Sequence, residues 1–382
     1  MSNLCPVKIT QELVRIKSIT PDVGKCLDVV EKYMQDIGAK VYRKVFSGDG
    51  SYDVDNLYAR IGSGQPHIML VGHVDVVAVG NLQDWKYNPW GGEIIDGNLY
   101  GRGSADMKSG VACAISTISE IANDPNLSGS VSILITGDEE ADAVNGSKKL
   151  LEYLHGKGEK WDCALTLEPT NFKTMGDQIK IGRRGSLTAN VIVKGKQGHV
   201  GYPEKTNNAI HNMNKLIASL LEMKMDNGND YFDPSSLQIV NICGGVGANN
   251  VVPGIANFTF NIRFSSEFTS DTLQDLICKT LDKTGLEYDM HILGNNRSFI
   301  TEPNKNTLAD DLSKVIEKIS GSRPKYVTSG GTSDSRFVVE YCPVIDYGVS
   351  CQTIHQVDEY VTVDHINQLN QILIEYLKNK VC

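Results

Sequence analysis

Hydrophobic positions along the first 170 residues follow two different periods. Segments 9–17 and 106–122 repeat apolar residues every three or four positions, which predicts amphipathic helices. Short apolar runs that are typical of buried strands lie at 56–61, 67–72, 130–136 and 163–167. Because strands that alternate with helices form mainly parallel sheets covered by those helices, we expect an α/β fold.

The pattern changes after Glu168. Apolar and polar residues alternate at 179–195 and 257–264, as in strands with one exposed face, and helical periods occur at 207–223 and 271–285. The α/β pattern then returns and continues to a C-terminal helix. We therefore predict a discontinuous α/β domain, 1–184 and 298–382, with an inserted α+β domain at 185–297.

The composition excludes several function classes. The 382 residues carry a formal net charge of −9, which argues against nucleic-acid binding because that function needs a basic face. Nine cysteines without a CxxC pair fit a reducing compartment, and they favour neither a disulfide framework nor a thiolate zinc site. No signal-peptide pattern and no apolar run of about 18 residues occurs, so we expect a soluble, cytoplasmic protein.

A histidine and an aspartate interrupt the apolar run at 70–80. A buried imidazole or carboxylate loses much solvation free energy unless it has a partner, so His73 and Asp75 must be paired. Residues two positions apart on a strand share a face, and we expect both near the carboxyl end of the strand, where ligands collect in α/β sheets. A hydrogen-bonded core pair is the ordinary structural alternative.

Five more polar residues follow predicted strands or begin predicted helices: Asp106, Glu139, Glu140, Glu168 and His355. Each alone has an ordinary explanation, as a helix N-cap for Asp106 or as solvated loop residues for the others. Together they can converge with His73 at the carboxyl edge of the sheet. The sequence therefore predicts one cleft lined by carboxylates and histidines.

Two histidines with several carboxylates and no cysteine form a ligand set that suits Zn²⁺, with Co²⁺ or Mn²⁺ as substitutes. Two ions fit better than one, because a carboxylate can bridge them and the pair can both polarise a carbonyl and activate water. Asp106, within a glycine-flanked turn, is the natural bridge. Asp75 is placed to orient the ring of His73 from behind.

The chain resembles the co-catalytic zinc aminoacylases and exopeptidases over nearly its whole length. That family's order and approximate spacing are matched by GHVDVV, GRGSADMKSG, TGDEE, LEP and IHQVDE. The resemblance implies one zinc held by His73, Asp106 and Glu168, and a second held by Asp106, Glu140 and His355. It also implies that Glu139 is the base that deprotonates water, and that the peptide bond after Asp106 is cis.

Stretches at 181–203, 247–265 and 330–337 look closer to one branch of this family. Its members remove succinate from N-succinyl-LL-2,6-diaminopimelate in lysine and diaminopimelate biosynthesis. The resemblance implies substrate contacts by Arg183, Ser186, Tyr202, Asn249, Thr332 and Arg336. Arginine suits such a substrate because the guanidinium group pairs with carboxylates in a bidentate geometry.

The same resemblance implies roles for the inserted domain. The domain is expected to act as a lid and to form a homodimer, through edge strands and amphipathic helices that pair across a two-fold axis. His199 is expected to stabilise the oxyanion in the active site of the partner.

Two positions depart from the family pattern. Ala78 lies in a segment where the family often has VVP, and Cys351 lies where asparagine is frequent, four residues before His355. Both departures affect expected substrate contacts and leave the expected metal ligands unchanged.

Two alternative functions stay open from the sequence. An acetylornithine deacetylase, or another deacylase or exopeptidase of the family, would share every metal ligand, although RRGS and GGTSD favour the succinyl substrate. An inactive metal-binding scaffold is the alternative outside enzymes. Such a protein is expected to lose Glu139, whose role is proton transfer, and the glutamate is present.

Overall fold

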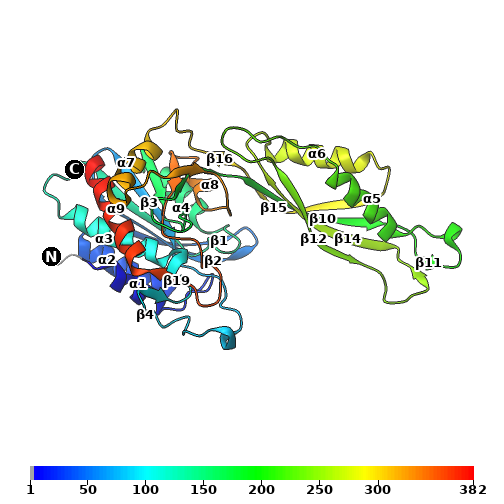
Figure 1. The fold of residues 1–382 in the computed structure, drawn as a ribbon, viewed down its shortest axis with the longest axis horizontal. Helices are drawn as coiled ribbons and strands as arrows, with labels where there is room; N and C mark the ends of the chain where they lie inside the picture. The colour runs from blue at the N-terminus through cyan, green and yellow to red at the C-terminus, as the bar shows by residue number, and fades with distance from the viewer. Residues whose placement is uncertain (1–3) are drawn as a thin grey trace. The chain divides into compact units, whose positions relative to one another are not determined.

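The computed structural model describes residues 4–382, which form two compact units. The first unit runs to Gly182 and resumes over Thr301–Val327 and Ser333–Cys382. The second unit comprises Arg183–Ile300 and Thr328–Thr332, and most of it is green and yellow in Figure 1. The predicted insertion, 185–297, falls within the second unit.

An eight-stranded sheet forms the centre of the first unit. Its order is β1 (Lys40–Gly48), β2 (Ser51–Gly62), β6 (Ser130–Thr136), β3 (His67–His73), β7 (Cys163–Thr166), β18 (Val344–Asp346), β8 (Gln178–Lys180) and β17 (Lys325–Val327). The neighbours β6, β3, β7 and β18 run parallel to one another, whereas β1 and β2 add an antiparallel edge. The predicted mainly parallel α/β sheet is confirmed, and the carboxyl ends of its four central strands lie at one edge.

Helices pack around this sheet. They are α1 (Pro6–Val14), α2 (Gly24–Ile37), α3 (Ser109–Ala122), α4 (Ser147–Gly156), α7 (Leu308–Ser320), α8 (Ser335–Val338) and α9 (Val363–Val381). Helices α1, α3 and α9 pack on one another and lie side by side in Figure 1. Every residue of β3 and β6 is buried, as expected for strands covered by helices. Within residues 4–382, no helix combines the length and apolar character that a membrane span requires.

A small three-stranded sheet completes the first unit. Its order is β19 (Tyr360–Thr362), β5 (Asn98–Tyr100) and β4 (Glu93–Ile95). It joins the segment after His355 to the segment before Asp106, two regions that are far apart in the sequence.

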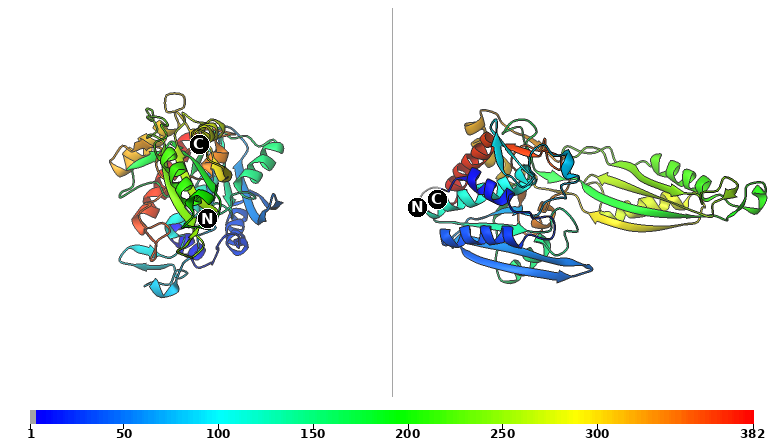
Figure 2. Two further views of the ribbon diagram at one scale, coloured as in Figure 1. Left: turned by 90° about the vertical axis from the view of Figure 1, so that its right-hand side faces the viewer. Right: turned by 90° about the horizontal axis from the view of Figure 1, so that it is seen from below.

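The second unit is an antiparallel sheet with two helices on one face (Figure 2). The strand order is β12 (Ser236–Gly244), β14 (Ile255–Phe264), β10 (Gly185–Lys194) and β15 (Tyr288–Asn296), and the helices are α5 (Ala209–Leu221) and α6 (Ser270–Asp282). Alternate residues of β14, among them Phe258 and Phe260, are buried in one core with Leu216 of α5 and Ile277 of α6. Short pairs are formed by β11 (Gly198–His199) with β13 (Val251–Val252), and by β9 (Gly182–Arg183) with β16 (Phe299–Ile300).

Two element boundaries differ from the sequence-based expectation. Strand β3 ends at His73, so Asp75 lies in the loop beyond the strand and not on its face. The helix expected from residue 106 begins only at Ser109, because Asp106 and Met107 have non-helical backbone angles. Both departures occur where the chain presents polar side chains.

Candidate metal centre

The carboxyl edge of the first unit's sheet gathers the predicted polar residues. His73 is the last residue of β3, Glu139 and Glu140 follow β6, and Glu168 follows β7. His355 lies on the loop between β18 and β19. Parallel neighbours in the sheet therefore bring together residues that are separated by up to 282 positions.

One candidate ligand group consists of His73, Asp106 and Glu168, all of which are buried. The Nε2 atom of His73 lies 3.2 Å from Oδ1 of Asp106 and 3.6 Å from Oε1 of Glu168. The other ring nitrogen, Nδ1, donates to the backbone carbonyl of Asp75 at 2.9 Å. This hydrogen bond leaves Nε2 as the nitrogen that faces the two carboxylates.

A second group consists of Asp106, Glu140 and His355. The Nε2 atom of His355 lies 3.4 Å from Oδ2 of Asp106 and 3.2 Å from Oε2 of Glu140. The side chain of His355 is 49% exposed, so this group opens toward solvent. In each group the ligand atoms all lie within 4.8 Å of one another. Nitrogen and oxygen donors at this spacing fit a divalent cation such as Zn²⁺.

Asp106 belongs to both groups and uses a different oxygen toward each histidine. The peptide bond between Asp106 and Met107 is cis, as the family resemblance implies. The preceding turn depends on Gly103, which has a φ of 81° and whose added Cβ would lie 2.5 Å from a methyl carbon of Val76. A larger residue at position 103 would therefore displace the turn that carries Asp106.

Asp75 makes contacts that the sequence did not indicate. Its carboxylate accepts hydrogen bonds from the backbone N–H groups of Glu139, at 3.3 Å, and Glu140, at 3.1 Å, and from the hydroxyl of Thr20 at 2.8 Å. Its Oδ1 also lies 3.5 Å from Nδ1 of His73. Asp75 therefore holds the loop that carries both glutamates, in addition to lying beside the histidine ring.

The charges in this centre perturb one another. Hydrogen bonds with Asp106 and Glu140 raise the pKa of His355 to about 10. Burial alone would lower the pKa of His73, but Asp106 and Asp75 raise it well above the ordinary value. Burial would raise the pKa of Asp106, yet the two histidines hold it below its usual range. The carboxylates therefore attract protons onto the histidines, at the positions where a cation would bind.

Glu139 belongs to neither of the two groups. Burial and the neighbouring charge of Glu168 raise its pKa well above that of an ordinary glutamate. A carboxyl group with a raised pKa is suited to take up and return a proton near neutral pH.

The remaining predicted residues are distributed over both units. Arg336 lies in α8 of the first unit, where its guanidinium group lies 4.5 Å from the centre of the Phe337 ring. The other six belong to the second unit: Arg183, Ser186, His199, Tyr202, Asn249 and Thr332.

Two of these six residues have contacts that define their local setting within the second unit. The Nη1 atom of Arg183 donates to the carbonyl of Gly331 at 2.7 Å. His199 is exposed, and its Nδ1 accepts a hydrogen bond from Gly201 at 2.9 Å. Glu359, a buried residue beside Asp106, is a functional candidate that the sequence does not reveal, because its contacts connect positions that are 253 or more residues apart.

Comparisons with known proteins agree with this geometry. Residues 69–379 match the model of the family described as peptidase family M20/M25/M40. Over 377 residues the chain is 41% identical to a succinyl-diaminopimelate desuccinylase of Rhodopseudomonas palustris (strain BisA53), with 96% of each chain covered.

Solved structures show the same fold at lower identity. An M20 family metallo-carboxypeptidase from Sulfolobus solfataricus is 18% identical with a TM-score of 0.81, and the match covers 98% of each chain. An aminopeptidase from Bacillus cereus is 21% identical with a TM-score of 0.78, over 98% of this chain and 97% of the other.

The raised pKa of His355 predicts that metal binding releases a proton. With a pKa of about 10, His355 is protonated at neutral pH in the metal-free protein, and a cation must displace that proton. Affinity for the second Co²⁺ ion should therefore rise by about tenfold per pH unit between pH 6 and 8. Calorimetric titration in buffers of different ionisation enthalpy measures the protons released.

His355→Ala should bind one Co²⁺ ion in place of two and lose this proton release. His211→Ala, which removes an exposed histidine of the second unit, is the matched control and should behave like the wild type. Two ions bound by His355→Ala at wild-type affinity would remove His355 from the ligand set.

Proposed function

Because this chain belongs to peptidase family M20/M25/M40, it is a metal-dependent hydrolase, and we propose that it cleaves N-succinyl-LL-2,6-diaminopimelate to succinate and LL-2,6-diaminopimelate. The observation that carries the proposal is the 41% identity to a succinyl-diaminopimelate desuccinylase across 96% of both chains. Every expected metal ligand is present in this chain, and the ligands form two groups that share Asp106.

The cofactor we propose is a pair of Zn²⁺ ions per subunit, with Co²⁺ or Mn²⁺ as substitutes. His73, Asp106 and Glu168 would hold one ion, and Asp106, Glu140 and His355 the other. Such a pair polarises the substrate carbonyl and acidifies water near it.

Glu139 performs the proton transfers in this proposal. Its carboxylate accepts a proton from the attacking water and then delivers it to the amine nitrogen as the amide C–N bond breaks. The remaining proton of the water passes from the new carboxyl group to the amine, so the products are the succinate carboxylate and an ammonium group, and protons balance within one turnover. The raised pKa of Glu139 supports this role, because it favours the acid form that protonates the leaving group.

Asp75 supports the proton transfer by holding the loop that carries Glu139. Its carboxylate accepts from the backbone N–H groups of Glu139 and Glu140 and thereby fixes the loop between the proton carrier and a metal ligand. This position agrees with the assignment of Asp75 to the catalytic machinery.

Substrate recognition is assigned to polar residues of both units. The proposed contacts are Arg183, Ser186, Tyr202, Asn249, Thr332 and Arg336, with His199 stabilising the oxyanion from the partner subunit. Arg183 and Arg336 provide permanent positive charge for the carboxylates that distinguish the succinyl substrate from an acetyl substrate. Ala78 and Cys351 are the two family departures that could modify these contacts.

Deacylation of another N-acyl amino acid is the runner-up function. Acetylornithine, or a short peptide, would use the same metal ligands and the same Glu139. Specificity for the succinyl group therefore depends on the proposed arginine contacts and not on the metal centre.

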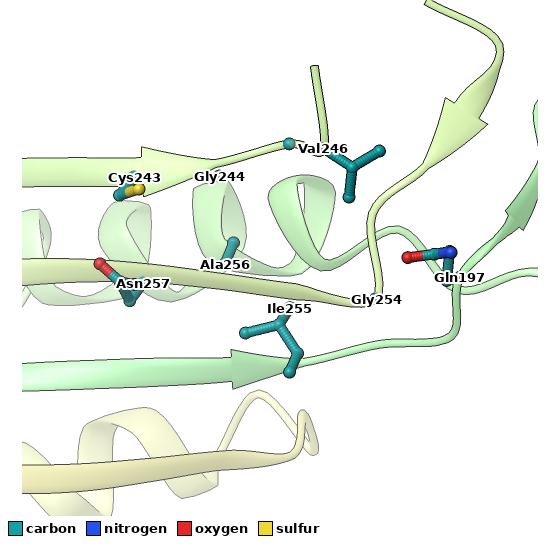
Figure 3. Close-up of a pocket in the computed structure, with 9 residues that line it drawn as sticks. Gln197, Cys243, Gly244, Val246, Gly254, Ile255, Ala256 and Asn257 are labelled. Carbon is teal, nitrogen blue, oxygen red and sulfur yellow. The ribbon is translucent and has the colours of Figure 1, made fainter. Parts of the chain in front are cut away.

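The second unit is also the proposed dimer interface. Val240 and Ile242, two large apolar residues of the edge strand β12, are 59% and 56% exposed. Beside the end of this strand lies a hollow of about 520 Å³, where Figure 3 shows Val246 and Ile255. An exposed strand edge next to apolar side chains suits pairing with a second copy of the chain.

Glu139→Gln tests the proton carrier. The amide keeps the size of the side chain but cannot accept the proton, so kcat should fall by about 10²- to 10⁴-fold. Co²⁺ stoichiometry, measured on the same samples, should stay at the wild-type value because Glu139 belongs to neither ligand group. Near wild-type turnover of the metal-loaded variant would show that another group carries the proton.

A substrate comparison tests the proposed function itself. Zinc-loaded protein should prefer N-succinyl-LL-2,6-diaminopimelate over N-acetylornithine by about 10⁴-fold in kcat/KM, because the acetyl compound lacks the carboxylate that the proposed arginine contacts would bind. Arg183→Ala should erode most of this preference. Arg323→Ala, at an exposed ion pair with Asp310, is the control. Equal rates on both compounds, or faster acetylornithine cleavage, would leave only the wider deacylase assignment.

Charge on the β12 edge tests the dimer. The double variant Val240→Lys, Ile242→Lys should raise the dimer dissociation constant by at least about 100-fold, because it places like charges in an apolar contact. Sedimentation velocity over a range of concentrations measures this constant. Leu293→Lys, on the opposite edge strand β15 and 63% exposed, is the matched control. An unchanged dimer in the double variant would exclude this edge from the interface.

A further inference from the structure

We propose that Glu359 is a positioning residue that fixes the turn around Asp106 and joins it to the loop that carries His355. The inference rests on the proposed metal ligands, and it concerns a residue that is in neither ligand group. Glu359 is fully buried, on the segment just before β19.

Both carboxylate oxygens of Glu359 are occupied by the Asp106 turn. Oε1 accepts from the backbone N–H of Ala105 at 3.0 Å and from that of Asp106 itself at 3.1 Å. Oε2 accepts from the N–H of Gly103 at 3.0 Å. One side chain therefore satisfies three backbone donors within four residues, which leaves that backbone little freedom to move.

Arg102 extends this contact to the second ligand group. Its Nη1 donates to Oε2 of Glu359 at 2.6 Å, and its Nη2 donates to the backbone carbonyl of His355 at 3.4 Å. The guanidinium group also lies 5.2 Å from the ring centre of Trp85. The pair Arg102–Glu359 thus connects the residue shared by both groups to the histidine found only in the second.

The His355 loop needs such support. His355 and Asp358 both have positive φ angles, 61° and 56°, a conformation that non-glycine residues adopt only when their surroundings impose it. Asp358 accepts from the backbone N–H groups of Lys86 and Tyr87 at 2.9 and 3.1 Å. Thr353 donates to the carbonyl of Tyr360 at 2.7 Å and closes the loop.

A buried charge pair therefore links the turn to the loop. Removing one member of such a pair leaves the other charge buried and uncompensated. The expected consequence is a displaced Asp106 or His355. The metal affinity of the second ligand group should then fall more than that of the first, because the first contains neither His355 nor its loop.

Glu359→Gln tests this inference with Co²⁺ as the probe. The amide keeps the size of the side chain but offers one acceptor oxygen where the carboxylate offers two. Affinity for the second Co²⁺ ion should fall by about 10- to 100-fold, with the first ion retained. The visible absorption spectrum of the Co²⁺-loaded protein should change, because it reports the geometry of the ligands directly.

Asp226→Asn is the matched control. Asp226 is a carboxylate of the second unit that accepts from the backbone N–H groups of Gly228 and Ser235, and it lies in neither ligand group. Its replacement makes the same chemical change at a turn without candidate ligands. It should leave both Co²⁺ affinities and the spectrum as in the wild type.

Conservative variants keep the test informative if Glu359→Gln does not fold. Glu359→Asp and Arg102→Lys preserve the charges but alter the geometry. Each should weaken the binding of the second Co²⁺ ion while the first ion stays bound. Wild-type affinities and spectra in the folded variants would overturn the positioning role. Failure of the wild type to bind two Co²⁺ ions would instead overturn the proposed metal centre.

Discussion

The repulsion among carboxylates at one edge of the sheet is the constraint on which this structure depends. Asp106, Glu140 and Glu168 are brought together there with Glu139, and burial makes their mutual repulsion costly. His73 and His355 relieve part of it by holding protons, as their raised pKa values indicate. The divalent cation that we propose for each group would relieve it further.

The topology of the sheet brings these carboxylates together. Strands β3, β6 and β7 are adjacent and parallel, so the residues that follow them must meet. Their buried apolar residues fix the positions of the strand ends, where His73 is the last residue of β3 and the glutamates follow β6 and β7. The apolar core therefore determines where the ligands lie, and secondary contacts such as those of Asp75 determine how they point.

The sequence was sufficient for the parts that depend on local periodicity. The period of apolar residues predicted β2, β3, β6 and β7 and the helices α1, α3 and α9 of the first unit. The order of polar residues after the strands predicted which side chains would meet. It could not locate the end of β3 at His73, because the apolar run continues through Val74 and Val76 into the loop. It also could not reveal that Asp75 binds the backbone of Glu139 and Glu140, since backbone donors leave no trace in residue identity. Glu359 gives no signal in the sequence either, because three of its partners are backbone N–H groups and all of its partners lie 253 or more residues away.

Under the proposed assignments, the division of the chain separates hydrolysis from selectivity. Every residue of the two ligand groups, together with Glu139, Asp75 and Glu359, belongs to the first unit, whose core is the eight-stranded sheet. Most of the proposed substrate contacts belong to the second unit, which has a core of its own around Phe258 and Phe260. Substitutions among the substrate contacts can therefore alter which acyl group is accepted without disturbing the core that positions the metal ligands. This separation is a physical reason why one ligand arrangement can serve several substrates, and why the substrate must be assigned from residues such as Arg183 and not from the metal centre.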